Sequence, residues 1–94
     1  MKICWLDEAI VDLQSLREHI TLDNPLAANR VAHRIIKAAN LLAEHPEMGR
    51  PGRVNGTREL IVTGTPYLIP YRVKNNNIQI LRIFHGAMLW PGEL

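Results

Sequence analysis

The chain has very few residues of the types that carry covalent or disulfide chemistry. Cys4 is the only cysteine among 94 residues, so no disulfide can form within one molecule and a disulfide-stabilised secreted scaffold is excluded. Ser15 is the only serine, and the pattern places it mid-helix, which excludes a Ser-His-Asp triad. The apolar run at residues 3–6 is too short for a signal peptide or a membrane span. We therefore expect a cytoplasmic protein with no membrane contact.

Metal-binding and phosphate-binding motifs are also missing. The four histidines and the cysteine show neither paired histidines at i, i+4 nor a CxxC spacing. The glycines near residue 50 lack the lysine and the spacing of a phosphate-binding loop. We therefore expect no metal and no cofactor.

Charge is distributed unevenly along the chain. Residues 1–47 contain five Lys/Arg and seven Asp/Glu, a net charge of −2, whereas residues 48–94 contain six and two, a net charge of +4. This asymmetry favours a basic surface on the C-terminal half. The alternative is an ordinary solvated surface whose asymmetry arose by chance.

The N-terminal half predicts a short strand and a helical hairpin. Residues 2–6 have a strand-like composition, and Asp7 stands where a helix N-cap belongs. Apolar residues then recur at helical spacing as far as residue 22. Asn24 and Pro25 start a second helix, which Pro46 should stop. The first apolar stripe is Ala9, Leu13, Leu16 and Ile20, and the second is Ala28, Val31, Ala32, Ile35, Ala39 and Leu42.

Three strand-like runs follow a loop at residues 47–57. They cover residues 58–62, 67–73 and 78–85, and the asparagines at 75–77 predict a tight hairpin because Asn tolerates positive φ. Pro70 cannot donate to a ladder, so it must lie at an edge, a bulge or a non-bonded site. The fold class is α+β with the order β-α-α-β-β-β. We expect one domain over residues 1–94, in which an antiparallel sheet packs against an N-terminal antiparallel helical hairpin.

Basic side chains of the C-terminal half remain as candidates for function. Arginine offers a fork of donors that matches phosphate or carboxylate, and a histidine can exchange protons in RNA cleavage. A structural role is the alternative, because a histidine at a strand end is often simply hydrogen-bonded. The candidate basic surface consists of Arg50, Arg53, Arg58, Arg72 and Arg82, with His85 beside it. We expect Arg58 and Arg82 to lie close together on one sheet surface.

Five sequence phrases, taken in order, carry a family resemblance. They are NPLAA at 24–28, HPEMGR at 45–50, RELIV at 58–62, YLIPYRV at 67–73 and ILRIFHG at 80–86. Together they resemble the RelE/ParE superfamily of bacterial toxins from toxin–antitoxin modules. In that superfamily RelE-like members cut messenger RNA on the ribosome, whereas ParE-like members poison DNA gyrase without established catalytic chemistry.

The chain looks closer to the ParE branch. Its loop lacks the lysine cluster of RelE-like nucleases, and we expect no further C-terminal helix after Trp90-Pro91. Arg58, Arg82 and His85 match positions that nuclease members use. However, Gly86 follows the histidine where a tyrosine would be expected, and residues 87–89 (AML) replace an arginine of many ParE-like chains.

The resemblance implies a toxin that inhibits DNA gyrase by binding and is neutralised by a ParD-like antitoxin. Leu13, Leu16 and Ile20, with the sheet edge, are the expected antitoxin-binding residues, and the basic surface is expected to contact the target. One alternative is a ribosome-dependent messenger RNA endoribonuclease with Arg58, Arg82 and His85 as catalytic residues. Another is an inactive toxin that only binds its antitoxin.

Overall fold

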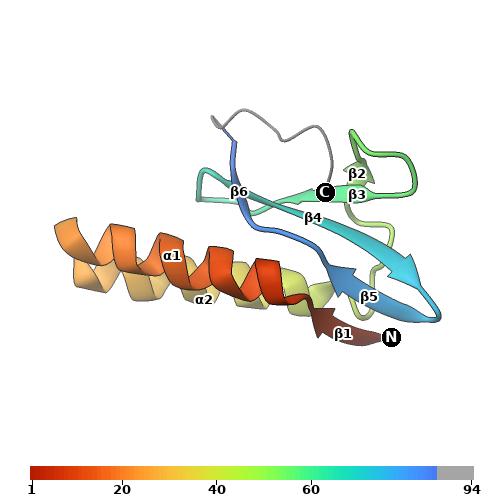
Figure 1. Cartoon of the computed structure of the whole chain (residues 1–94), viewed down its shortest axis with the longest axis horizontal. Coiled ribbons are helices and arrows are strands. Elements are labelled where there is room, and N and C mark those ends of the chain that lie inside the picture. Colours follow the sequence, from red (N-terminus) through yellow and green to blue (C-terminus); the bar gives the residue numbers. More distant parts are fainter. Residues whose placement is uncertain (87–94) are drawn as a thin grey trace.

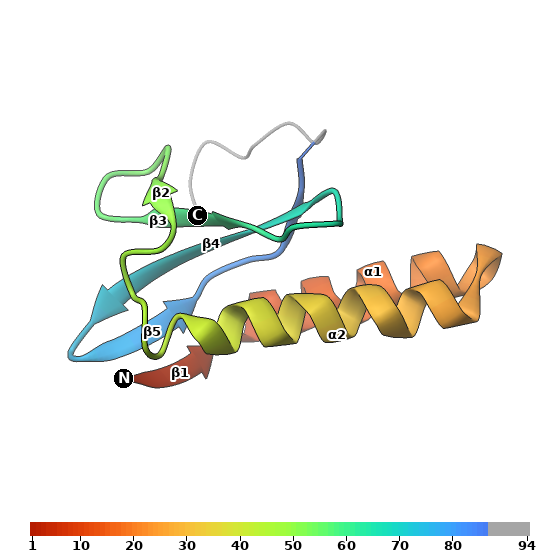
Figure 2. The same cartoon turned by 180° about the vertical axis from the view of Figure 1, so that it is seen from behind.

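Two antiparallel helices cover one face of a sheet in the computed structural model, which describes residues 1–86 (Figure 1). Helix α1 spans Asp7–Asp23 and helix α2 spans Pro25–Leu41. The end of the hairpin that carries the α1–α2 turn extends past the strands, and the view from behind shows the same arrangement (Figure 2). The α+β class and the helical hairpin are thus confirmed.

The hairpin turn consists of one residue. Asn24 caps α2, its Oδ1 atom accepting a hydrogen bond from the Ala27 amide at 3.1 Å, and Pro25 occupies the first helical position. Helix α1 ends at Asp23, one residue past the predicted end, but the predicted N-cap of α1 and the predicted end of α2 were wrong. Leu6, and not Asp7, occupies the N-cap position of α1, and its side chain makes no capping hydrogen bond. The amide of Leu6 still bonds to the Ile80 carbonyl of the sheet, so the helix begins only after this residue. Helix α2 ends at Leu41 in tight turns, before Pro46 is reached.

The core lies between the hairpin and the sheet. The predicted stripe of α2 faces inward, and its alanines allow the neighbouring helix to approach closely. Tyr71 and Ile35 are among the largest fully buried side chains. The core also contains Ala9 and Leu16 of α1 and Leu60, Ile69, Ile78 and Ile80 of the sheet.

The sheet has the strand order β1-β5-β4-β3-β2, and β6 also pairs with β4. The strands are β1 (Lys2–Trp5), β2 (Arg50–Pro51), β3 (Arg58–Ile61), β4 (Tyr67–Lys74), β5 (Asn77–Ile80) and β6 (Phe84–His85). The expectation of an antiparallel sheet was wrong at one edge, where β1 pairs with β5 in parallel and makes the sheet mixed. The β4–β5 turn was predicted correctly, because Asn75 and Asn76 have φ angles of 53° and 62°.

The predicted last strand is split into β5 and β6. Pro70 of β4 accepts a hydrogen bond from the Leu81 amide at 3.0 Å through its carbonyl, but it has no N–H to return. Pairing therefore lapses over residues 81–83 and resumes where Leu68 faces Phe84. Pro70 thus lies at the predicted interruption of the ladder, within a central strand.

No helix within residues 1–86 is long and apolar enough to cross a membrane. The predicted features of Ala87-Met88-Leu89 and Trp90-Pro91 lie outside the described residues.

Candidate functional site

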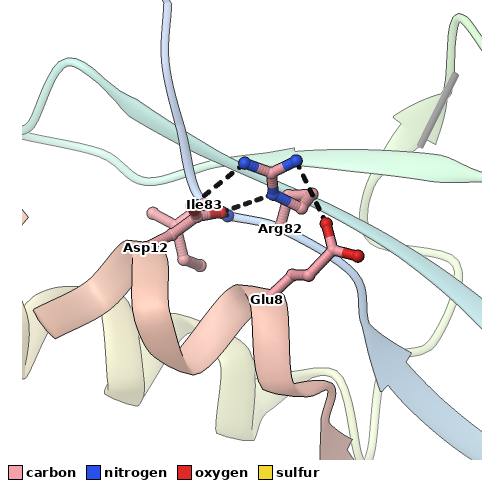
Figure 3. A network of polar contacts seen from close by, with 4 residues as sticks. All are labelled: Glu8, Asp12, Arg82 and Ile83. Atoms are coloured by element: carbon pink, nitrogen blue, oxygen red, sulfur yellow. Dashed lines mark hydrogen bonds and ion pairs between the residues drawn. The ribbon is translucent and has the colours of Figure 1, made fainter. Parts of the chain in front are cut away.

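Arg82 is bound to helix α1 by a network of charged groups (Figure 3). Its Nε donates to Asp12 Oδ2 at 2.7 Å, and its Nη2 donates to Asp12 Oδ1 at 3.1 Å. Asp12 Oδ2 also accepts the Ile83 amide at 2.9 Å, and Glu8 lies 3.3 Å from Arg82 Nη1. The hydrogen bond to Asp12 raises the pKa of the Arg82 guanidinium further, while burial opposes it. Arg82 therefore bridges the break in the sheet to α1.

The environment of Arg82 differs from the prediction. The residue lies in the irregular segment after β5, not on a strand. Its guanidinium carbon is 4.8 Å from the ring centroid of Phe84, so the guanidinium also makes a cation–π contact with this ring. The side chains of Arg82 and Asp12 are only 26% and 17% exposed, which makes their bidentate pair partly desolvated.

Arg58, on β3, makes different contacts. Its Nη1 donates to the carbonyl of Gly49 at 2.7 Å and more weakly to that of Glu47 at 3.4 Å. The hydroxyl of Tyr71 donates to the Pro46 carbonyl at 2.7 Å and accepts the Gly49 amide at 2.9 Å. A Cβ at Gly49 would lie 2.6 Å from the Tyr71 ring, so the close approach requires glycine. Arg58 and Tyr71 thus fix the segment that leads into β2.

The three other arginines of the predicted basic surface make contacts that differ from those of Arg58 and Arg82. Arg50 Nη2 is 3.2 Å from Glu59 Oε1, and the same carboxylate accepts the Arg53 amide at 2.9 Å. Glu59 is only 2% exposed, a buried acid whose role the sequence prediction missed. Arg72 Nε donates to Gln79 Oε1 at 2.7 Å, across the β4–β5 pair. The arginines predicted to form one basic surface are therefore each engaged within the protein.

His85 packs against Tyr67 in a T-shaped arrangement, with ring centroids 5.4 Å apart and planes at 83°. Burial raises the pKa of the Tyr67 phenol, so the hydroxyl stays protonated at neutral pH. A groove of about 400 Å³ opens beside these rings. It is lined by Asp12, Ser15, Leu16, His19, Tyr67, Arg82, Ile83, Phe84 and His85.

The residues predicted to bind an antitoxin face mainly inward. Leu16 is 8% exposed and belongs to the core, while Leu13 and Ile20 are half-buried and pack against it. Leu16 also lines the groove beside His85, whereas Leu13 lines a separate groove of about 920 Å³ between the two helices. The structure therefore divides this predicted set between two surfaces.

A third groove, of about 630 Å³, lies between α2 and β3, and the functional prediction did not include it. The helical spacing of Arg30, Arg34 and Lys37 could have drawn attention to it, since they recur on one side of α2. Within residues 1–86 no cluster of three or more His, Cys, Asp or Glu residues could hold a metal ion.

Comparisons with known proteins identify the family. The family described as "ParE toxin of type II toxin-antitoxin system, parDE" matches residues 3–90. The chain is 42% identical to toxin Y4kP of Sinorhizobium fredii over 93 residues, covering 99% of this chain and 96% of the relative. It is also 42% identical to toxin RelE2 of Caulobacter vibrioides over 88 residues, covering 94% and 98%.

Two solved structures with a similar fold are described as toxin–antitoxin systems. One is described as the chromosomal ParDE TA system from P. aeruginosa, with a TM-score of 0.82, 33% identity and coverage of 90% of this chain and 95% of the other. A second is the toxin-antitoxin complex RelBE2 from Mycobacterium tuberculosis, with a TM-score of 0.67, 26% identity and coverage of 89% and 95%. The chain therefore belongs to the ParE toxin family, within the ParE/RelE superfamily of type II toxins.

Proposed function

We propose that this toxin acts by binding its target, without a chemical step of its own, and that the target is DNA gyrase. The observation that carries the proposal is the state of Arg82. Its guanidinium is held by both oxygens of Asp12 and by Glu8, so a phosphate would have to displace two carboxylates to reach it. Displacing Asp12, whose side chain is 17% exposed, leaves a largely buried charge unpaired and is costly, whereas displacing the exposed Glu8 costs little.

The acid–base groups nearby also favour binding over catalysis. Burial raises the pKa values of Tyr67 and Tyr71, so both phenols stay protonated at neutral pH and do not serve as bases. The Tyr71 hydroxyl already bonds to the Pro46 carbonyl and the Gly49 amide. The remaining candidates are His85, which is stacked edge-on against Tyr67, and His19, which lines the same groove. Histidines without an available arginine beside them are a weak basis for RNA cleavage.

DNA gyrase is proposed because of the ParE branch of the family. The family match is to ParE toxins, and the neighbour with the TM-score of 0.82 is described as a ParDE system. A cognate antitoxin of the ParD type is proposed as the neutralising partner, since both structural neighbours are described as toxin–antitoxin assemblies. The groove that contains Leu16 and the aromatic rings of Tyr67 and Phe84 offers a pocket for an apolar anchor of that antitoxin.

An endoribonuclease of the RelE type is the second candidate. Two relatives are named RelE2 and RelE3, and the groove beside His85 places this histidine within reach of a ligand that also touches Arg82. An inactive toxin that only binds its antitoxin is the third. The three proposals differ in what the purified protein does to gyrase and to translated messenger RNA.

The test is a supercoiling assay with purified DNA gyrase. We expect the wild-type protein to inhibit supercoiling, the cognate antitoxin to reverse the inhibition, and His85→Ala to inhibit about as well as the wild type, because no proton transfer is needed. Absence of inhibition at toxin concentrations in excess of gyrase would contradict the gyrase proposal. Cleavage of ribosome-bound messenger RNA in a parallel translation reaction would then select the nuclease.

A further inference from the structure

The two helices of the hairpin carry opposite net charges. Helix α1 contains five acidic residues and one basic residue, a net charge of −4, whereas α2 contains three basic residues and no acidic residue, a net charge of +3. Charge counts for the two halves of the sequence do not show this difference, because both helices lie within residues 1–47. A polyanion is therefore attracted to α2, which lies in front of α1 in the view of Figure 2, and repelled by α1.

The three basic residues of α2 form one stripe. Arg30, Arg34 and Lys37 follow one another at spacings of four and three residues, so the 3.6-residue repeat puts them on one side of the helix. That side is opposite to the buried Ala32 and Ile35, and the three basic side chains are exposed. The α2 basic stripe covers about 10 Å of the helix axis, at about 1.5 Å per residue.

The charged groups of the α2 basic stripe are available to a ligand. Arg30 and Lys37 make no hydrogen bond or ion pair within residues 1–86, and Arg34 donates only to the Thr63 carbonyl, at 3.2 Å. A Cβ at Gly64 would collide with Arg34 Nη1, and Gly64 has a φ of 79°, so this position of the β3–β4 turn requires glycine. The turn thus holds the Arg34 guanidinium in place before a ligand arrives, which lowers the entropy cost of binding.

The surroundings of the stripe favour one class of polyanion. The lining of the groove beside it contains no acidic residue and no Phe, Tyr or Trp. Proteins that bind single strands usually stack the bases on aromatic side chains, and this surface offers none. Duplex DNA presents a line of phosphates, about one charge per 3.4 Å of axis on each strand, that a straight row of cations can contact. The major groove of B-DNA also admits an α-helix, whereas that of duplex RNA is too narrow.

We propose that the α2 basic stripe binds the phosphate backbone of double-stranded DNA without reading its sequence. The guanidinium groups of Arg30 and Arg34 bind phosphate oxygens through paired N–H donors, and the Lys37 ammonium adds a third contact. The negative charge of α1 confines the DNA to the α2 side of the hairpin. The proposal does not depend on whether gyrase is the target, because it concerns DNA bound by the toxin alone.

The salt dependence of binding tests the number of phosphate contacts. The probe is a fluorescein-labelled DNA duplex of about 20 base pairs and mixed sequence, and fluorescence anisotropy measures its affinity for the purified toxin. Three phosphate contacts give a slope of about −2.7 for log affinity against log salt concentration, so affinity should fall about fortyfold between about 50 and about 200 mM NaCl. A slope shallower than about −1, or no binding at about 50 mM NaCl, would overturn the proposal.

The position of the site is tested by Lys37→Gln against Lys74→Gln. Both changes remove the charge of an exposed lysine, but Lys74 lies at the β4–β5 turn, outside the groove. We expect Lys37→Gln to make the slope shallower by about 0.9 and to weaken binding about eightfold at about 0.1 M salt, and Lys74→Gln to change neither. Equal effects of the two variants would contradict a site on α2. Circular dichroism checks folding, and Arg30→Gln, for which we expect the same loss, replaces Lys37→Gln if that variant does not fold.

The class of ligand is tested by competition and by NMR. We expect the duplex to bind at least about tenfold more tightly than either of its single strands, because the stripe offers no stacking surface. Displacement of the duplex by poly-L-glutamate at equal charge would assign the stripe to an acidic polypeptide, and tighter binding of an RNA duplex would assign it to RNA. Amide chemical shifts should change along α2 and at residues 63–65 when the DNA duplex is added. Changes confined to the segments around Arg50, Arg53 and Arg72 would place the DNA on the C-terminal arginines and overturn the proposal.

Discussion

The arginines of the C-terminal half and the basic residues of α2 behave differently, although they carry the same charge. Arg58 and Arg82 are bound to carbonyl and carboxylate groups of the protein and connect segments far apart in the sequence. Arg30 and Lys37 have no hydrogen bond or ion pair within residues 1–86 and line an open groove. The charge counts placed the basic surface on the C-terminal half, whereas the groove lined by available basic side chains lies along α2.

The difference shows that the net charge of a sequence segment predicts neither whether its basic side chains are exposed nor whether they are available to bind a partner. Arginine is well suited to both roles, because its five donors can bind a ligand or satisfy several protein acceptors at once. Which role it takes depends on the acceptors that the fold brings near. For Arg82 that acceptor is Asp12, which lies 70 residues earlier in the sequence.

The largest expected effect is that of Asp12→Ala. The change leaves the Arg82 guanidinium and the Ile83 amide without their shared acceptor in a partly buried site. We expect the free energy of unfolding to fall by about 3 kcal/mol, measured by urea denaturation. A loss below about 0.5 kcal/mol, the range of ordinary surface changes, would mean that Arg82 is not held structurally.

Arg58→Ala should have the next largest effect. It removes the donor to the Gly49 and Glu47 carbonyls and loosens the segment that Tyr71 also fixes. We expect a loss of about 1.5–2 kcal/mol in the free energy of unfolding, because the bonds are charge-assisted. Full stability combined with lost toxicity would return Arg58 to the target-binding surface that the sequence predicted.

Glu8→Ala tests the same network at its exposed end. The Glu8 side chain is 74% exposed, so solvent screens its ion pair with Arg82. We expect a loss of about 0.5 kcal/mol or less, smaller at high salt. An effect as large as that of Asp12→Ala would show that both carboxylates, and not Asp12 alone, hold the guanidinium.

The double change Arg30→Ala with Lys37→Ala should have the smallest effect on stability. Neither side chain has a partner within the described part of the chain, so unfolding should shift by no more than about 0.5 kcal/mol. Thermal and urea denaturation measure the shift. A larger loss would show that the α2 charges are structural, and the contrast with the C-terminal arginines would disappear.

Local signals were sufficient for much of the fold. The cap at Asn24, the proline after it and the turn at residues 75–76 depend on neighbours in sequence, and all three were predicted correctly. Pro70 predicted an interruption of the ladder, but its location opposite residues 81–83 and the parallel pairing of β1 with β5 depend on contacts between distant segments. No local pattern encodes such contacts, so the sheet was predicted to be simpler than it is.

The same limit applies to the site. The residue types were identified, because arginines on a strand-rich half are visible in the sequence. Their partners were not, since Asp12 and Glu59 look like ordinary surface acids until the fold places one against Arg82 and buries the other.

The central claim is that the toxin acts without cleaving RNA, and mapping of messenger 5′ ends in cells tests it most directly. The toxin and its His85→Ala variant are expressed at equal levels, and the ends are compared with those in uninduced cells. The account predicts the same end map in all three cultures, together with growth arrest by both toxin forms. New ends in phase with codons, present with the wild type and lost with His85→Ala, would contradict it and assign the nuclease function.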